Sequence, residues 1–193
     1  YVTSIYVKKV WDDNDNRTNN RPESIQVQLK GNNSNLGDNV TLNETNEWTY
    51  IWRDYKQDDS ISYTVEEVET PEGYITKITG NQENGFTITN TLETVAVSGT
   101  KTWNDADDQD GKRPESITVK LMNGTTEVAS QEVTADNNWA YSFTNLPRYA
   151  NGQEITYTVK EVAVDGYTSE VNGYDITNTH TPETVKLQVD KTW

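Results

Sequence analysis

The sequence predicts an all-β protein built from two tandem β-sandwich domains, and three observations lead to this fold class. The 193-residue chain contains one pattern twice, and each copy has about 90 residues, a size that suits a sandwich. Threonine, valine and isoleucine are frequent, which favours strands. Clusters of Gly, Pro, Asn and Asp separate short alternating segments, as turns separate strands.

The internal repeat sets the expected domain boundaries. KVWDDNDNRTNNRPESIQVQL begins at Lys9 and KTWNDADDQDGKRPESITVKL begins at Lys101, and the segments that follow match in the same order. We therefore expect one domain over residues 1–92 and a second over 93–182. Residues 183–193 contain VKLQVDKTW, which repeats VAVSGTKTW from the start of the second copy. This segment predicts the first strand of a truncated third repeat, and the chain is expected to be part of a longer protein.

Each predicted strand of the first copy has a period of two. In IYVKKVW, SIQVQL and WTYIW, branched or aromatic residues occupy alternate positions, as in a half-buried strand. ISYTVEEV and FTITNT begin with the same alternation, and the second copy contains counterparts of all these segments. The predicted ranges are Ile5–Trp11, Ser24–Leu29, Trp48–Trp52, Ile61–Val68 and Phe86–Thr91.

Three polar residues in each copy share the face that carries the apolar residues. In VAVSGTKTW, for example, Lys101 has the same parity as Val97 and Trp103. A glutamate ends the apolar face of ISYTVEE and ITYTVKE, and an asparagine follows the isoleucine of ITNT. The residues are Lys9, Glu67 and Asn90 in the first copy and Lys101, Glu161 and Asn178 in the second. Buried charges and amides are costly unless they are paired, so this placement needs a reason.

Two interpretations of the inward polar residues are open. The first is a structural lysine–glutamate ion pair beside a hydrogen-bonded asparagine near the ends of the sandwich. The second is a reaction, in which a lysine amine attacks an asparagine carboxamide, releases ammonia and leaves an amide crosslink. Burial lowers a lysine pKa and supplies the neutral amine. A buried glutamate can donate and shuttle the proton.

The combined pattern K-x-W, DGKRPESI, NNWAYSF, YTVKE, DGY and ITNT resembles the Cna B-type repeat of Gram-positive surface adhesins. The resemblance covers nearly the whole chain, twice, and implies a reversed-immunoglobulin, transthyretin-like sandwich. It also implies an isopeptide bond between the first and last strands of each domain, promoted by a middle-strand acid. Carried over by motif position, the implied sets are Lys9, Asn90 and Glu67, then Lys101, Asn178 and Glu161. Lys191 matches the same lysine of the third copy, whose partners are missing, so it should be unreacted.

The adjacent Lys8 has outward parity, which leaves Lys9 as the expected crosslinking residue of the first copy.

Two acidic loops, Asp12–Glu23 and Asn104–Glu115, raise the question of calcium binding. An EF-hand loop requires oxygen ligands at fixed positions and a closing glutamate. In the second loop Ala106 and Ile117 occupy the first and last ligand positions, and the first loop lacks the glycine. We therefore expect solvated loops and no metal site, and no pattern indicates a cofactor.

Recurring tryptophans are expected to pack in the core rather than to stack on carbohydrate, because they have inward parity. They are Trp11, Trp48, Trp103 and Trp139. His180 is the single histidine, so no catalytic triad or histidine-rich metal site is available.

Composition narrows the function classes. The net charge of −15 without a basic cluster argues against nucleic acid and anionic membrane surfaces as binding partners.

The leading hypothesis is a stalk segment of a cell-wall-anchored, extracellular adhesin that presents an adhesive domain. Its expected partners are neighbouring repeats of the same chain, and host matrix through another domain, and the chain is expected to be a monomer. The alternatives are repeats that bind host matrix themselves and a segment of a sortase-assembled pilin. A turnover enzyme is disfavoured, because the lysine, glutamate and asparagine react once.

Overall fold

The computed structural model describes residues 1–193 as two compact units. The first unit comprises Tyr1–Val95 and Pro147–Ile155, and the second comprises Ala96–Leu146 and Thr156–Trp193. The segment Pro147–Ile155 groups with the first unit, although the repeat pattern places it in the second copy. The domain limits drawn from the repeat therefore stay a prediction.

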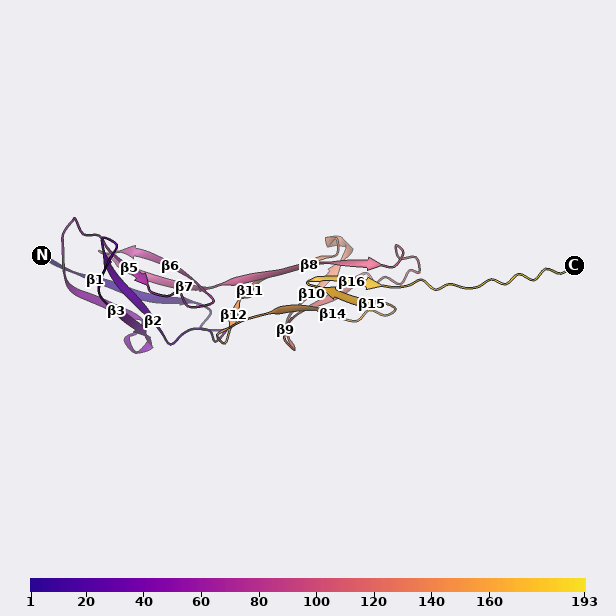
Figure 1. Ribbon diagram of the computed structural model, residues 1–193, viewed down its shortest axis with the longest axis horizontal. Coiled ribbons are helices and arrows are strands. Elements are labelled where there is room, and N and C mark those ends of the chain that lie inside the picture. The colour runs from indigo at the N-terminus through magenta and orange to yellow at the C-terminus, as the bar shows by residue number, and fades with distance from the viewer. The chain divides into compact units, whose positions relative to one another are not determined.

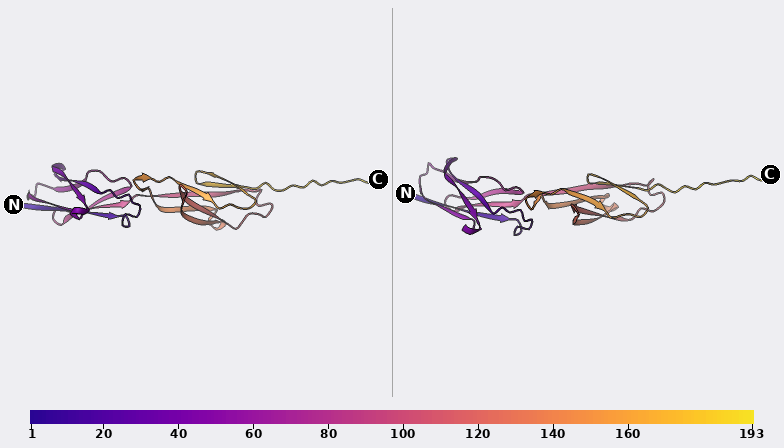
Figure 2. Two further views of the ribbon diagram at one scale, coloured as in Figure 1. Left: turned by 90° about the horizontal axis from the view of Figure 1, so that it is seen from below. Right: turned by 60° about the horizontal axis from the view of Figure 1, so that its bottom comes forward.

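In the first unit the strands form two sheets, which lie in two layers (Figure 1, Figure 2). One sheet has the order β4-β1-β7-β6 and the other has the order β3-β2-β5. Their bounds are β1 Val2–Asp12, β2 Ser24–Gly31, β3 Ser34–Asn43, β4 Thr49–Lys56, β5 Tyr63–Glu67, β6 Tyr74–Asn81 and β7 Gly85–Leu92. A 3-10 turn, Glu44–Asn46, precedes β4, and the short strands β12 (Tyr149–Ala150) and β13 (Gln153–Glu154) pair with each other.

The second unit repeats this arrangement. Its sheets have the orders β11-β8-β16-β15 and β10-β9-β14. The bounds are β8 Thr94–Asn104, β9 Ser116–Asn123, β10 Thr126–Thr134, β11 Ala140–Pro147, β14 Tyr157–Glu161, β15 Thr168–Asn172 and β16 Asp175–Thr179. A 3-10 turn, Ala135–Asn137, precedes β11. The prediction of an all-β fold with two tandem sandwich domains is confirmed.

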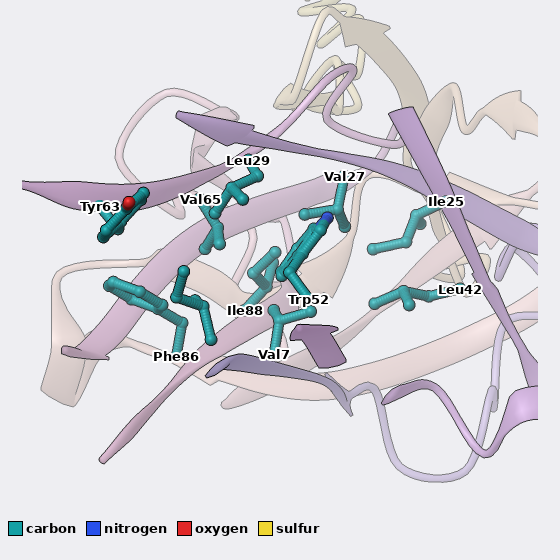
Figure 3. Close-up of a cluster of buried hydrophobic side chains, with 11 residues drawn as sticks. Val7, Ile25, Val27, Leu29, Leu42, Trp52, Tyr63, Val65, Phe86 and Ile88 are labelled. Atoms are coloured by element: carbon teal, nitrogen blue, oxygen red, sulfur yellow. The ribbon is translucent and has the colours of Figure 1, made fainter. Parts of the chain in front are cut away.

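The core of the first unit lies between its two sheets. Figure 3 shows Val7 and Ile88 from one sheet beside Val27 and Val65 from the other. Val7, Val27 and Ile88 are fully buried, because alternate residues of each strand face inward. Burial of each such side chain contributes about 1.5–3 kcal/mol. The alternation predicted from the sequence therefore defines the inner faces.

The first and last strands of each domain are neighbours and run parallel. β1 pairs with β7, with Lys9 opposite Ile88, and β8 pairs with β16, with Lys101 opposite Ile176. A sandwich whose chain enters and leaves through adjacent parallel strands carries end-to-end tension across that one pair. This pairing also places the candidate site.

Two strands of the first sequence copy, β3 and β6, were not predicted. β3 and β6 are edge strands whose residues are mostly exposed, so they lack the alternation of apolar side chains that identifies a half-buried strand. Their charged and polar composition is typical of sheet edges, where it discourages pairing with other chains.

The predicted strand of a third repeat is not formed. Residues 180–193 contain no strand (Figure 1). Lys191 is exposed, and its Nζ lies 3.6 Å from the centroid of the Trp193 ring. No neighbouring strand pairs with this segment, so its backbone groups have no ladder to join. No helix in the structure has the length and apolarity needed to cross a bilayer.

Candidate functional site

The structure brings the inward polar residues of each copy together between the first and last strands. Lys9 on β1 lies opposite Ile88, and Asn90 is two residues further along β7 on the same face. The acid comes from the other sheet, where Glu67 ends β5. The second domain uses the same offsets. Two equivalent groups therefore arise from one sequence pattern.

All six of these side chains are buried, although each is polar or charged. The exposed fractions are 6% for Lys9, 7% for Glu67, 0% for Asn90, 4% for Lys101, 8% for Glu161 and 0% for Asn178. Lys8, by contrast, is exposed, as its outward parity predicts. The inward placement expected from alternation is confirmed.

Hydrogen bonds join the amide to the acid in both domains. Asn90 Nδ2 donates to Glu67 Oε1 at 3.2 Å, and Asn178 Nδ2 donates to Glu161 Oε1 at 2.7 Å. In the second domain Lys101 Nζ lies 3.8 Å from the other carboxyl oxygen, Glu161 Oε2. In the second domain one carboxyl group thus lies between an amine and a carboxamide.

Each group also leaves polar atoms unsatisfied. Asn90 Oδ1, Asn178 Oδ1, Glu67 Oε2 and Glu161 Oε2 are buried and have no hydrogen-bond partner. Such atoms are rare in folded proteins, because an unpaired buried polar group costs about 1–3 kcal/mol. The same unpaired oxygens occur in both domains, so hydrogen bonding alone does not explain why these polar residues are buried together.

Burial shifts the ionisation of these groups towards their neutral forms. It lowers the pKa of Lys9 from 10.5 to about 7, against the opposing charges of Glu67 and Asp13. It lowers the pKa of Lys101 to about 8, against the charge of Glu161. Burial also raises the pKa of Glu161, although Asn178 and Lys101 oppose this shift. A substantial share of each lysine is therefore a neutral amine near pH 7 to 8.

Tryptophan rings form one wall of each site. Lys9 Nζ lies 3.3 Å from the centroid of the Trp11 ring, and Lys101 Nζ lies 3.2 Å from that of Trp103. Trp48 meets Trp11 edge-on at 5.4 Å, and its carbonyl accepts a hydrogen bond from the Lys9 backbone N–H at 2.8 Å. Trp11 and Trp48 also pack against the hydrophobic cluster, so the predicted packing role of these two is confirmed.

Trp103 and Trp139 form the same edge-on pair in the second domain, with their ring centroids 5.2 Å apart. Both are half-buried, and the Trp139 carbonyl accepts from the Lys101 backbone N–H at 2.7 Å. Trp48 and Trp139 adopt left-handed backbone conformations, with φ of 59° and 58°. Such a φ is uncommon for a bulky residue, and it turns each tryptophan onto the lysine strand.

A second buried cluster was missed by the sequence analysis. The loops were expected to be solvated, but Asp13 and Asp105 are only 2% exposed, so that expectation is wrong for these two residues. Arg113 donates to Asp105 through Nε at 3.0 Å and Nη2 at 2.6 Å, and Tyr167 Oη donates at 2.8 Å. The hydrogen bonds from Arg113 hold the pKa of Asp105 well below its usual range. Asp13 makes the same contacts with Arg21 and Tyr74 in the first domain.

Replacing Asp105 by alanine is expected to destabilise the second domain by about 1–3 kcal/mol, because it leaves the donors of Arg113 and Tyr167 without their buried acceptor. Urea unfolding followed by tryptophan fluorescence measures the change. The exposed Asp165 on a nearby loop is the control, since Asp165→Ala should change the free energy by no more than about 0.5 kcal/mol. Equal stability of the two variants would contradict a structural role for Asp105.

The acidic loops and His180 are the remaining candidate sites. No group of three or more histidine, cysteine or acidic residues is placed to hold a metal ion. His180 Nε2 lies 2.9 Å from Asp110 Oδ2, and its Nδ1 lies 2.8 Å from the Gly166 carbonyl oxygen. The hydrogen bond with Asp110 raises the pKa of His180. These contacts fasten the segment after β16 to the acidic loop.

The fold and the site together define a tandem β-sandwich repeat protein with a buried lysine–glutamate–asparagine group in each domain. The family model for the Cna protein B-type domain matches the chain twice, over residues 5–91 and 97–179. The chain therefore belongs to the Cna B-type domain family, as its motifs indicated.

Known relatives agree with this assignment. A collagen adhesin of Staphylococcus aureus is 41% identical over 196 residues, a match that covers 99% of this chain and 17% of that protein. The crystal structure of two B repeat units of the S. aureus collagen binding protein matches with a TM-score of 0.55 and 40% identity. That match covers 94% of this chain and 50% of the solved one. The TIE protein of Bacillus anthracis, at 18% identity and a TM-score of 0.50, shares the fold over 92% of this chain and 33% of its own.

Proposed function

We propose that the chain is a pair of stalk repeats from a bacterial surface adhesin, and that each repeat closes an isopeptide bond between its first and last strands. The bonds join Lys9 to Asn90 and Lys101 to Asn178. One observation carries this proposal: in both domains the amine, the acid and the carboxamide are buried together, with oxygens that no hydrogen bond satisfies. Packing alone does not account for such a group, because it would be more stable as apolar residues.

The contacts in the second domain support a complete reaction path. The neutral Lys101 Nζ attacks Asn178 Cγ, and the C–N bond to Nδ2 breaks as ammonia leaves. One proton must pass from Nζ to Nδ2 for the atoms to balance. Glu161 can carry it, since Oε2 lies 3.8 Å from Nζ and Oε1 lies 2.7 Å from Nδ2. A protonated carboxyl takes a proton on one oxygen and releases one from the other, and so ends unchanged.

The first domain offers the same groups for the same step. Lys9 is the nucleophile, Asn90 the carboxamide and Glu67 the acid. Folding buries the three groups in one site, which replaces a bimolecular encounter with an intramolecular one. Each set reacts once and is consumed. The chain is therefore a self-crosslinking structural protein rather than a turnover enzyme, and the reaction calls for no cofactor.

The position of the bonds suits a part that bears tension. Pulling on the two ends of the chain loads β1 against β7, whose backbone hydrogen bonds contribute only about 1 kcal/mol each. A bond from Lys9 to Asn90 carries that load directly. Nearly all residues between Lys9 and Asn90 then bear none of the applied force. The second domain has the same arrangement through Lys101 and Asn178.

A stalk of this kind serves a larger protein at the cell surface. The chain spans 17% of the collagen adhesin that it matches, so the adhesive domain and the cell-wall anchor are assigned to other parts of the parent chain. We propose that the repeats act as a monomer, with neighbouring repeats of the same chain as their direct partners. Contact with host matrix is assigned to another domain. Lys191 is exposed and stays unreacted in this chain.

Intact mass under denaturing conditions tests the crosslinks. Each bond removes one ammonia, about 17 Da, so the purified chain should be lighter than its sequence by about 34 Da. Peptide mapping should then join Lys9 to Asn90 and Lys101 to Asn178. A chain with the full sequence mass would contradict the proposal and leave two buried ion pairs in its place.

A further inference from the structure

A threonine hydroxyl lies inside the reacting group of the first domain. Thr76 is half-buried on β6, opposite Asn90 in the antiparallel pair β6–β7. Its Oγ1 donates to Glu67 Oε1 at 2.7 Å and accepts from Asn90 Nδ2 at 2.8 Å. The direct distance from Asn90 Nδ2 to Glu67 Oε1 is longer, at 3.2 Å. The two individually shorter hydrogen bonds between the acid and the leaving nitrogen therefore pass through the hydroxyl.

The second domain lacks this connection. Ser169 on β15 occupies the matching place opposite Asn178, but it is exposed, and no hydrogen bond joins it to Glu161 or to the amide. There the acid contacts the amide nitrogen directly at 2.7 Å. One chain thus holds two versions of the site that differ in the group between acid and leaving nitrogen.

We propose that Thr76 relays the proton from Glu67 to the departing nitrogen of Asn90, while Glu161 delivers its proton to Asn178 without a relay. This inference rests on the proposed crosslinks. As Lys9 Nζ bonds to Asn90 Cγ, Glu67 takes the surplus proton from Nζ on the oxygen that has no partner. When Glu67 carries a proton on Oε1, that oxygen donates to Thr76 Oγ1 and the hydroxyl rotates its own proton towards Nδ2. Glu67 Oε1 then passes its proton to Thr76 Oγ1, which hands its own proton to Nδ2. The bond from Cγ to Nδ2 breaks, ammonia leaves, and the threonine ends as it began.

Thr70 is a further hydrogen-bond partner of the relay hydroxyl. Its hydroxyl oxygen lies 3.2 Å from Thr76 Oγ1. A hydroxyl has one rotatable donor and two acceptor positions, so Thr76 can donate to Glu67 or to Thr70 while it accepts from Asn90. Once the acid is protonated and donates to Thr76, the hydroxyl proton can turn towards Asn90 Nδ2, which is the orientation that a relay requires.

The test measures both bonds in one molecule over time. The full chain is made by cell-free synthesis and quenched in denaturant at intervals, and the two crosslinked peptides are quantified by mass spectrometry. Thr76→Val keeps the branched shape and removes the hydroxyl. We expect it to slow the Lys9–Asn90 bond by roughly 10² or more, the usual contribution of a placed proton donor. The Lys101–Asn178 bond in the same molecule should form at its original rate.

Two further variants separate a relay from a packing role. Thr76→Ser restores the hydroxyl with less bulk and should recover most of the rate, whereas loss of packing would not be repaired by serine. Ser169→Ala, at the matching position of the second domain, should leave both rates unchanged. A Thr76→Val chain that crosslinks Lys9 as fast as the wild type would overturn the relay, and so would equal slowing by valine and serine. If the wild type forms neither bond, the proposed function itself fails, which is a distinguishable result.

Discussion

Glu161→Gln is expected to leave the second domain without its crosslink while the first domain keeps its own. Glutamine has the same shape as glutamate but cannot take a proton from Lys101 and release one to Asn178. Peptide mapping should therefore recover the Lys9–Asn90 product and unjoined peptides from the second domain. The mass deficit should fall from about 34 Da to about 17 Da.

The stability of the second domain should fall by a large amount in the same variant. The bond closes a loop of roughly 80 residues, and the loss of such a loop removes about 4.5 kcal/mol of restraint on the unfolded chain, by analogy with a disulfide. For a domain of about 90 residues this corresponds to a decrease in Tm of roughly 20–30 °C. Calorimetry should show two separated transitions in place of the wild-type profile.

A matched variant shows whether the bond itself carries the effect. Lys101→Met removes the nucleophile and keeps an unbranched apolar side chain, so it should lower the Tm of the second domain to a similar degree. The double variant should lose little more than either single one, because both act through one bond. Full crosslinking of Glu161→Gln at the wild-type rate would remove Glu161 from the mechanism.

The site was predictable because its signal is local and repeated. The alternation of VAVSGTKTW and its counterparts fixes which side chains face inward, and the structure buries Lys9 and Lys101 as that parity requires. The pairing of these lysines with Asn90 and Asn178 came from family resemblance, since parity cannot say which strands are neighbours. The parallel pairing of the first and last strands supplies that contact.

Other features had weaker signals in the sequence. Thr76 lies on an edge strand with little apolar alternation, so neither the strand nor its hydroxyl was predicted. Asp13 and Asp105 lie in acidic loops whose composition indicates exposure, although the structure buries both residues. Their signal was the constant spacing to Arg21 and Arg113, eight residues further along in both copies. The composition of a loop describes its residues on average, whereas the burial of one carboxylate depends on the single arginine that pairs with it.

In both domains the packing around the buried lysine favours its neutral form. Aromatic walls and the opposite sheet exclude water, and burial moves the lysine pKa values to about 7 and about 8. The apolar surroundings that stabilise the sandwich thus also prepare the nucleophile. Under the proposed function, the packing that stabilises each repeat is also what makes its lysine reactive.

Under tension, the wild-type chain is expected to show no unfolding step from either domain in single-molecule stretching from its two ends. The proposed crosslinks would connect β1 to β7 and β8 to β16, so the force would pass through covalent bonds and the residues between them would bear almost none of it. The Glu161→Gln chain should add one step as its second domain opens. Release of roughly 80 residues, at about 3.5 Å each when extended, gives a step of roughly 250–280 Å.

The first domain of the same molecule is the internal control, since its bond through Lys9 is intact and it should add no step. Adding Glu67→Gln should produce a second step of similar length. Two such steps in the wild-type chain would contradict a force-bearing role for the crosslinks, whatever the mass showed. A wild type without steps, together with one step per acid removed, would tie the mechanical stability of each repeat to the reaction of its own lysine.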